Sequence, residues 1–514
     1  MGCGASKQNF PRITAPPELV PEQHAHCTKS QAVSDGSQQP RTLVEAKQEL
    51  EVQQAEQSSV QSNDPQDKSK VQSQVESGDL FVDTEFPATL TSLSTNTGHE
   101  SYSSFQEAVW RRPNEFMNCS YDEIKVFDTV DINDIEQGML GDCYFLSAIS
   151  GLAEVPQRVQ RLFESSEINK SGKYKIKFFD QGIPRVITVD DQFPCKGENP
   201  DVPLFAKPKG KELWAILLEK AWAKMFKSYA NAEAGLIYEA LENLTGAPSL
   251  YYETSEESEE ETWSKIKNAD LKNYVIGASS QSDSSAQNYG IQEGHAYTVI
   301  SVHEVDGHRL LKLRNPWSTF EWNGDFSDSS PLWTDQLKKD LQYENGDNGV
   351  FYMSAKDFRT QFREYTIHCY EENWKYSYAQ SKTNCHHANY CKFNITKPGE
   401  AYFTVHQKDE RSQQDPAYKY SPVVDFMIAK VEKDGSSKLV CKYFLCVFLL
   451  NFSVVDSQTP SDRYASCGDR SIFMVKDGKV EIKEAGDCII RVKVNWRNSG
   501  DDTYTVSSYS SVPL

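Results

Sequence analysis

The chain has 514 residues, of which 38% are hydrophobic and 11% aromatic, enough apolar surface for two to four domains with packed cores. Its formal net charge of −20 argues against nucleic acid as a partner, because phosphate binding requires a basic surface. The twelve cysteines follow no paired spacing and no secretory signal precedes them, which predicts a reducing, cytoplasmic compartment.

The first residues match a lipid-attachment pattern. Gly2 with Ser6 fits N-myristoylation, and Cys3 beside it is a candidate for palmitoylation. One myristoyl chain holds a membrane only marginally, so stable anchoring needs a second signal, and too few basic residues lie nearby to supply it. We therefore expect a peripheral protein, tethered to the cytoplasmic face of a membrane by lipids on Gly2 and Cys3.

Residues 1–98 are rich in Gln, Ser, Glu and Pro and poor in aromatic residues. A segment of this composition buries too little apolar surface to offset its conformational entropy. We expect a disordered tail over this range.

The stretch from Gln137 to Phe145 places a cysteine at the start of an apolar helix. Gly138 and Gly141 allow a tight bend before the helix. Cys143 then lies at the helix N-terminus, where the dipole and unpaired N–H groups favour the thiolate. Its own N–H and the Gln137 side chain form a candidate oxyanion hole. This pattern predicts the nucleophilic half of a cysteine-protease site.

A second segment supplies the base. His295 opens a strand-like run, and after the turn at Asp306-Gly307 the chain returns toward Asn315 and Trp317. A hairpin across that turn brings His295 close to Asn315. Asn315 then holds the imidazole tautomer, His295 serves Cys143 as base, and Trp317 covers the pair from water.

The remaining patterns set the domain boundaries. One lobe carrying the cysteine is expected over residues 99–245, and a lobe carrying the histidine and asparagine over 246–370. An amphipathic helix is expected from Glu212 to about Tyr229, with an apolar face made by Leu213, Leu217, Ala221 and Met225.

After Trp374 the sequence changes to short strands and turns, which predicts an all-β antiparallel sandwich over residues 371–514. The expected strands include 425–429, 472–475, 489–494 and 504–506. The longest apolar run, 443–452, is too short to span a bilayer and is interpreted as a buried strand.

Three blocks, 137–145, 294–299 and 314–317, closely resemble the active-site blocks of calpains, the intracellular calcium-dependent cysteine proteases. Segments 189–194, 212–224, 321–324 and 327–328 add to the match, which is strong over about 100–370 and weak beyond. The resemblance implies a two-lobed papain-like α+β core followed by a calpain-type, C2-like sandwich. No later stretch matches an EF-hand loop, so we expect a form without the penta-EF-hand domain.

By this resemblance Cys143 is the nucleophile, His295 the base, Asn315 the orienter and Gln137 the oxyanion donor, with Trp317 as a wedge between the lobes. Two departures are mild. Tyr144 stands where animal calpains usually have Trp, and Ser318 where Gly commonly follows the Trp.

The resemblance also implies two calcium sites. The first comprises the carboxylates of Asp134 and Glu212 with backbone carbonyls near Phe127 and Thr129. The carboxylates expected at the second calcium site are those of Glu321 and Asp328. Asn348 and Val350 stand where the family commonly offers Asp and Glu, although Asp347 is a candidate replacement ligand. We expect a dominant first site and a weak second one.

The sequence therefore predicts a calcium-regulated, membrane-tethered cysteine endopeptidase that cuts protein substrates at limited sites. The alternative is a catalytically weak scaffold that uses the same fold to bind membrane or protein partners. The intact set of Gln137, Cys143, His295 and Asn315 favours the enzyme. A papain-type lysosomal protease is disfavoured because signal peptide and disulfide pattern are both missing.

Overall fold

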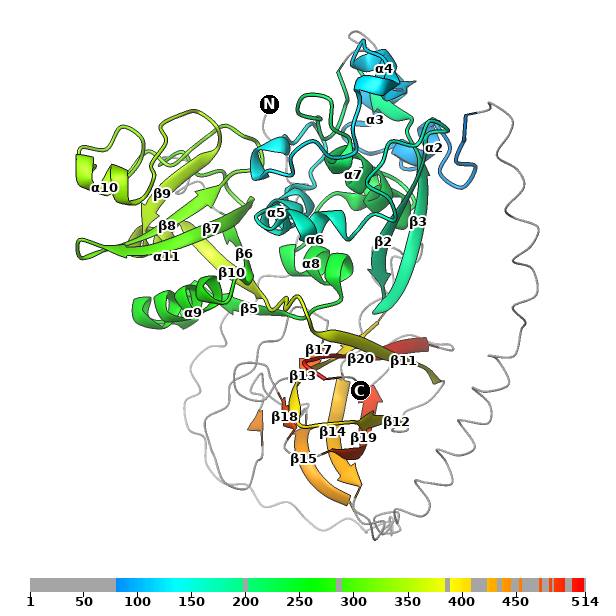
Figure 1. Ribbon diagram of the computed structural model, residues 1–514, viewed down its shortest axis with the longest axis vertical. Coiled ribbons are helices and arrows are strands. Elements are labelled where there is room, and N and C mark those ends of the chain that lie inside the picture. Colours follow the sequence, from blue (N-terminus) through cyan, green and yellow to red (C-terminus); the bar gives the residue numbers. More distant parts are fainter. Residues whose placement is uncertain are drawn as a thin grey trace, which may run out of the picture. The chain divides into compact units, whose positions relative to one another are not determined.

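The computed structural model is drawn in Figure 1. It describes residues 80–196, 202–282, 289–383, 389–407, 423–431, 437–444, 453–454, 471–473, 480–482, 485–494 and 502–512. Gly2, Cys3 and the rest of residues 1–79 lie outside these ranges.

Residues 80–98 belong to the folded first lobe, so the expected tail boundary at residue 98 is wrong. Phe86 is buried in an apolar cluster with Phe205. Leu93, the last residue of α2 (Leu90–Leu93), is buried in the same cluster. The backbone N–H of Asp83 also donates to the Asp190 carboxylate at 2.8 Å. The average composition of residues 1–98 is polar, so it does not reveal these few buried residues near the end of the segment.

The first lobe (residues 80–245) is built around α5 (Cys143–Ala153), α7 (Trp214–Met225) and α8 (Ile237–Thr245). All residues of α5 after Cys143 are buried, as expected for a helix at the centre of a core. The Phe145 ring stacks on Trp222 with 4.7 Å between centroids. The smaller elements are α3 (Tyr102–Gln106), β1 (Val109–Arg111), α4 (Pro113–Phe116), η1 (Tyr121–Glu123), η2 (Ile132–Asp134), α6 (Pro156–Gln160), β2 (Lys173–Asp180), β3 (Ile183–Asp190), β4 (Phe193–Cys195) and η3 (Ala230–Ala232).

Helix α7 occupies the middle of the range predicted from Glu212 to Tyr229. Leu217 and Ala221, on the predicted apolar face, are fully buried. Glu219, on the opposite face, and Lys220, beside the apolar face, are buried as well. The helix is therefore a core helix with two buried charged positions, not a surface amphipathic one.

The second lobe (residues 246–370) carries a six-stranded antiparallel sheet in the order β5-β10-β6-β7-β8-β9 (Figure 1). Its strands are β5 (Ser249–Glu253), β6 (Val275–Ser280), β7 (Ala296–Val305), β8 (His308–Arg314), β9 (Val350–Ser354) and β10 (Phe362–His368), with helices η4 (Thr254–Glu256), α9 (Glu259–Leu271), α10 (Asp335–Asp340) and α11 (Ala355–Gln361).

The predicted hairpin between β7 and β8 is confirmed. Its turn residues, Asp306 and Gly307, have φ of 49° and 77°. Positive φ at both positions is the type I′ geometry that matches the twist of paired strands. Asp-Gly is therefore a local signal that fixes the register of the pair.

The sheet is shared between two cores. Val275 of β6 packs into the core of the first lobe, and the next residue, Ile276, into that of the second, because successive strand residues face opposite sides. Helix α5 approaches so closely that a Cβ on Gly151 would lie 2.3 Å from Val275 Cγ1. The start of β7 is consequently fixed against the helix that begins at Cys143.

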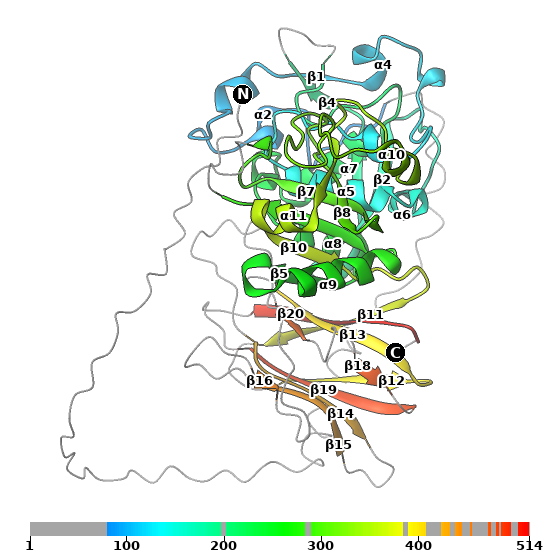
Figure 2. The ribbon, with the colours of Figure 1, turned by 90° about the vertical axis from the view of Figure 1, so that its left-hand side faces the viewer.

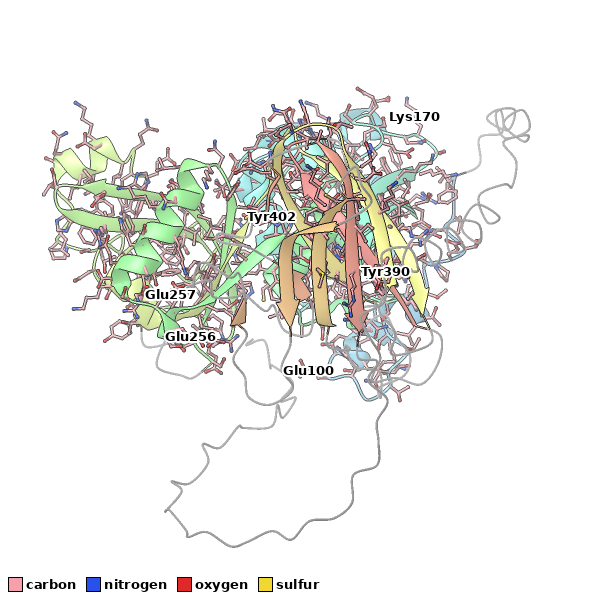
Figure 3. The ribbon with its side chains drawn as sticks, turned by 90° about the horizontal axis from the view of Figure 1, so that it is seen from below. Glu100, Lys170, Glu256, Glu257, Tyr390 and Tyr402 are labelled. Atoms are coloured by element: carbon pink, nitrogen blue, oxygen red, sulfur yellow. The ribbon has the colours of Figure 1, made fainter. Side chains whose placement is uncertain are left out.

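Residues 256–261 form an acidic run whose second half begins helix α9. Ser258 caps α9 through a reciprocal hydrogen-bond pair with Glu261. Glu256 and Glu257 precede the cap at the edge of the lobe (Figure 3). Glu257 is held by the Tyr365 hydroxyl at 2.7 Å. Glu257 and Glu261 of the acidic run therefore stabilise the local fold, one by accepting the tyrosine hydroxyl and the other as part of the helix cap.

The described strands after residue 371 form two antiparallel five-stranded sheets, visible as two layers in Figure 2. One contains β11 (Lys375–Thr383), β20 (Asp502–Ser510), β13 (Gly399–His406), β17 (Ser471–Phe473) and β18 (Val480–Ile482); the other contains β12 (Asn389–Ile395), β19 (Gly486–Val494), β14 (Val423–Val431), β15 (Ser437–Phe444) and β16 (Ser453–Val454).

Side chains from both sheets meet in one core, including Phe393 of β12, Phe403 of β13 and Ile490 of β19. Expected strands 425–429, 489–494 and 504–506 fall within β14, β19 and β20, and 472–475 begins in β17. Of the run 443–452, residues 445–452 lie outside the described ranges.

Candidate active site

Cys143 is the first residue of α5. The carbonyl oxygen of Asp142 accepts the N–H groups of Phe145 at 2.9 Å and Leu146 at 3.1 Å, so Asp142 occupies the N-cap position. Cys143 is only partly buried, whereas every later residue of the helix is buried. The thiol therefore lies at the accessible, positive end of the helix dipole, where the thiolate is stabilised.

Gln137 lies in the bend before the helix. Its Nε2 donates to the Leu140 carbonyl at 2.7 Å, which fixes the amide, and the same nitrogen carries a second N–H. The bend requires glycine at its next position, since a Cβ on Gly138 would lie 1.8 Å from the Phe205 carbonyl oxygen. This fixed amide is positioned to act as a preorganised donor.

His295 directly precedes β7, and Asn315 directly follows β8. His295 Nε2 and Asn315 Oδ1 are 2.9 Å apart. The Asn315 amide nitrogen donates to the carbonyls of Thr319 and Phe320 at 2.8 and 3.0 Å, which assigns its oxygen to the histidine. The His295 Nε2 therefore carries the proton, and Nδ1 remains as the basic nitrogen.

Aromatic rings enclose the imidazole. The Trp317 ring lies 4.5 Å from His295 between centroids, and Tyr297 packs edge-on at 5.0 Å. Burial lowers the pKa of His295 to about 4, opposed in part by the Asn315 hydrogen bond. Burial raises the pKa of Tyr297 and the charge of Cys143 adds to the rise, which places the thiol within electrostatic range of the ring beside His295.

Ser280 was not singled out by the sequence, yet it holds the histidine backbone. Its Oγ accepts the His295 N–H at 3.0 Å, and its own N–H donates to the His295 carbonyl at the same distance. Ser280 ends β6, a strand whose neighbour in the sheet is evident only from the three-dimensional pairing.

Hydrogen bonds join α5 to the second lobe. Ser147 Oγ donates to the Ala296 carbonyl at 3.0 Å, and Thr298 Oγ1 donates to the Ser147 carbonyl at 2.9 Å. The buried Arg314 reaches the Ile135 carbonyl at 2.6 Å. These contacts bring the segment before Cys143 and the strand after His295 into one site.

The two departures from the calpain pattern have local compensation. The Tyr144 hydroxyl donates to the Ala232 carbonyl at 2.8 Å and accepts the Trp222 indole N–H at 3.0 Å. Ser318 has a φ of 58°, a left-handed conformation that favours glycine. Its Oγ accepts from Arg314 at 3.0 Å and donates to the Ile135 carbonyl at 3.2 Å, which holds the serine there.

Asp134 and Glu212, the carboxylates of the first expected calcium site, are buried and close together. Burial raises the pKa of both, and the Asp134 charge adds to the rise at Glu212. Glu212 accepts the N–H groups of Asp128 and Thr129 at 2.9 and 3.4 Å, which holds the segment from Phe127 to Thr129 beside the carboxylates. Two adjacent buried carboxylates beside a backbone segment fit a calcium ion, which would balance their charge.

The second expected site also holds carboxylates that accept backbone hydrogen bonds. Glu321 Oε1 accepts the N–H groups of Asn348 and Gly349 at 2.9 and 2.7 Å. Asn348 Oδ1 accepts the Val350 N–H at 2.9 Å, so this side chain is used within its own turn. Burial raises the pKa of Glu321, and the charges of Asp328 and Asp347 add to it. With Asn348 and Val350 where the family commonly offers Asp and Glu, this donor set fits calcium less well.

Within the described ranges, no group of three or more His, Cys, Asp or Glu side chains has a metal-binding arrangement. The calcium interpretation at either place consequently depends on backbone carbonyls and water as well as on carboxylates.

Residues 81–369 match the model of the calpain family cysteine proteases. The chain is 37% identical over 312 residues to "Calpain-type cysteine protease DEK1" of Zea mays, covering 58% of this chain and 14% of that protein. The DEK1 protein of Arabidopsis thaliana gives the same identity and coverage.

"Calpain-8" of Mus musculus is 33% identical over 305 residues, covering 57% of this chain and 42% of that protein. The matched region is thus less than half of the length of each of these relatives. Since the family model covers more than half of this chain and includes all four predicted catalytic residues, the chain belongs to the calpain family of cysteine proteases.

Proposed function

We propose that this protein is an active cysteine endopeptidase in which Cys143, His295, Asn315 and Gln137 carry the reaction. The observation that carries the proposal is the 2.9 Å contact between His295 and Asn315, with the asparagine amide fixed by two carbonyls. A scaffold has no need of an imidazole tautomer held in this way.

In the proposed reaction, His295 Nδ1 accepts the Cys143 thiol proton and the sulfur attacks the carbonyl carbon of a peptide bond. The Cys143 N–H and the Gln137 amide stabilise the resulting oxyanion. The imidazolium then protonates the leaving amine as the C–N bond breaks, which leaves a thioester. His295 next takes a proton from water, and the hydroxide adds to the thioester. The tetrahedral intermediate collapses as its C–S bond breaks, the carboxylic acid is released, and His295 returns the proton to the Cys143 thiolate.

Burial among Trp317 and Tyr297 lowers the pKa of His295 to about 4. The free imidazole is therefore neutral at cytoplasmic pH and able to accept a proton. A neighbouring thiolate favours the imidazolium, so proton transfer from Cys143 stabilises both charges together.

Calcium regulation is part of the proposal. Asp134 and Glu212 would hold the dominant ion with carbonyls near Phe127 and Thr129, and the ion would neutralise their charge. Glu321 and Asp328 would form a weaker second site. The first site adjoins the protease loop in sequence, since only Ile135 and Glu136 separate Asp134 from Gln137.

Membrane tethering through lipids on Gly2 and Cys3 is also proposed, on the sequence pattern alone. Within the described ranges, no helix has the length and apolarity needed to span a bilayer. Protein substrates on or near the cytoplasmic face of a membrane would be the partners of such an enzyme.

The decisive experiment combines labelling with hydrolysis. The full chain is treated with iodoacetamide in calcium and in a chelator, and modified cysteines are identified by mass spectrometry. Casein cleavage is followed in parallel, with Cys143→Ser as the matched control. We expect calcium-dependent modification of Cys143 and cleavage that the control lacks. Unchanged cleavage by Cys143→Ser would refute the proposal. Modification without cleavage would favour the scaffold.

A further inference from the structure

Asp142 and Glu219 form a buried acidic pair directly behind the nucleophile. Asp142 is fully buried, and among the described residues no hydroxyl and no N–H of another residue donates to either of its carboxyl oxygens; its own backbone N–H opposes the rise of its pKa only in part. The group in hydrogen-bond contact with it is another carboxyl, that of Glu219 on α7. Two carboxylates repel each other, so a hydrogen bond between them requires a proton.

Glu219 also connects the pair to the other side of the active-site bend. Both of its oxygens accept the N–H of Ala206, at 2.9 and 3.1 Å. The segment around Ala206 lies along the bend: Met139 N–H donates to the Leu204 carbonyl at 3.1 Å and Lys207 N–H to the Glu136 carbonyl at 2.9 Å. The pair therefore joins the last residue of the bend, Asp142, to the segment that lines it.

The charges nearby do not balance the pair. Lys220, the next residue of α7, is bound to the Asp190 carboxylate and the Gln192 carbonyl. His99 lies 2.9 Å from Glu233, and the charge of Glu233 further disfavours ionisation of Asp142.

Tyr229 is another titratable neighbour; burial raises its pKa, and the charges of Glu219 and Asp142 add to the rise. Burial raises the pKa of Asp142 to about 8 and that of Glu219 well above its usual range. The nearby cations are engaged by other acidic groups. One proton held between the two carboxyls would therefore offset part of their negative charge.

We propose that Asp142 and Glu219 share one proton and that this hydrogen-bonded pair positions the bend from Gln137 to Cys143 for catalysis. The inference rests on the proposed protease function. The two residues are positioning residues, since they act through the bend and through the cap of α5. Loss of the shared proton leaves two buried negative charges that repel each other and displace the bend.

The test replaces one carboxyl by an amide. Asp142→Asn and Glu219→Gln each supply a permanent N–H donor at nearly unchanged volume, so neither variant needs the proton. Glu242→Gln, a buried carboxyl-to-amide change on α8, is the matched control. The kcat and KM of peptide hydrolysis by the full chain are measured with saturating calcium over a range of pH.

In the unmodified chain and in Glu242→Gln, kcat is expected to fall about tenfold per pH unit above about pH 8, with KM little changed. At least one of the amide variants should retain kcat at neutral pH within about threefold and lose this alkaline decline. Asp142→Ala, which removes the hydrogen bond, should lower kcat at least about tenfold at every pH. An alkaline decline that is identical in the unmodified chain and both amide variants would overturn the proposal.

A readout independent of activity separates this inference from the proposed function. Thermal unfolding is measured against pH in Cys143→Ser, with and without Asp142→Asn. A carboxyl whose pKa is raised on folding contributes stability below its unfolded pKa and loses it as pH rises toward about 8. The chain that keeps the Asp142 carboxyl should therefore lose stability over this range relative to the chain that also carries Asp142→Asn. Parallel curves would refute proton sharing even if the chain is an active protease.

Discussion

The backbone N–H of Gln137 donates a 3.1 Å hydrogen bond to the carbonyl oxygen of Pro316, which joins the bend before Cys143 to the loop after Asn315. The two halves of the site come from different lobes, and this bond uses backbone atoms only. Side-chain substitutions at Gln137 therefore change the proposed oxyanion donor without removing the connection between the halves.

Gln137→Ala is expected to lower kcat by about 10²- to 10³-fold with little change in KM, because the amide acts on the oxyanion of the transition state. Steady-state hydrolysis of a peptide substrate gives both constants. Gln336→Ala, on the exposed side of α10, is the control and should leave them unchanged. A loss of less than about threefold would show that Gln137 is no oxyanion donor.

His295 gives a prediction about acid stability. Its pKa is lowered to about 4 by burial, so the folded state disfavours protonation that the unfolded chain accepts near pH 6.5. The ring therefore makes the protein lose stability as pH falls from about 6.5 to about 4, by on the order of 3 kcal/mol in total.

The measurement uses the Cys143→Ser chain, in which no thiolate stabilises the imidazolium. Denaturant unfolding is compared between this chain and the same chain with His295→Gln. The difference in unfolding free energy between the two should change over that pH window, and His308→Gln, at an exposed position, should not reproduce the change. A constant difference between pH 7 and pH 4 would contradict the buried neutral imidazole.

Ser318 allows backbone strain to be separated from hydrogen bonding. Ser318→Ala keeps a side chain at a φ of 58° and loses both Oγ hydrogen bonds, so it should destabilise the fold by about 1–3 kcal/mol. Ser318→Gly loses the same bonds and relieves the left-handed strain, so it should be about 1 kcal/mol more stable than the alanine variant. Urea unfolding of both variants gives the two values. An alanine variant as stable as the glycine variant would show that the backbone is unstrained.

The parts of the site that the sequence predicts are those set by neighbours in the chain. Cys143 begins a helix because a glycine-containing bend precedes an apolar run, and the Asp306-Gly307 turn fixes the hairpin that brings His295 to Asn315. Each signal lies within about twenty residues of the feature it predicts, where turn chemistry and periodicity decide the geometry.

The parts that the sequence does not predict depend on distant contacts. Ser280 reaches His295 through strand pairing, and residues around Asp83 fold because they reach Asp190 far along the chain. Glu219 lies opposite the predicted apolar face of its helix, where a charged residue is expected to meet solvent, and its buried partner Asp142 lies on a different element. Composition and periodicity report on local segments and carry no information about which segments meet.

The lipid-anchor prediction is tested by fractionation. Gly2→Ala should move the protein from membranes to the soluble fraction, because no myristate can attach and acylation of Cys3 usually follows the first lipid. Cys3→Ser should release only part of it. Lys7→Ala, which leaves both acylation positions intact, is the control. A Gly2→Ala protein that still sediments with membranes would show that another part of the chain or a partner is the tether.

Calcium activation should depend mainly on Asp134. Asp134→Ala removes one of two adjacent buried carboxylates and should abolish activation, since calcium prefers six to eight oxygen ligands and this site has few to lose. Glu321→Ala should shift the calcium midpoint by no more than about threefold, because Asn348 and Val350 stand where the family commonly offers Asp and Glu, and the Asn348 side chain already accepts the Val350 N–H. Peptide hydrolysis titrated with calcium gives both midpoints, and calcium binding to the Cys143→Ser background, measured calorimetrically, separates lost binding from lost catalysis. Large and equal effects of the two variants would show that the second site is intact, and full activity in a chelator would remove calcium from the mechanism.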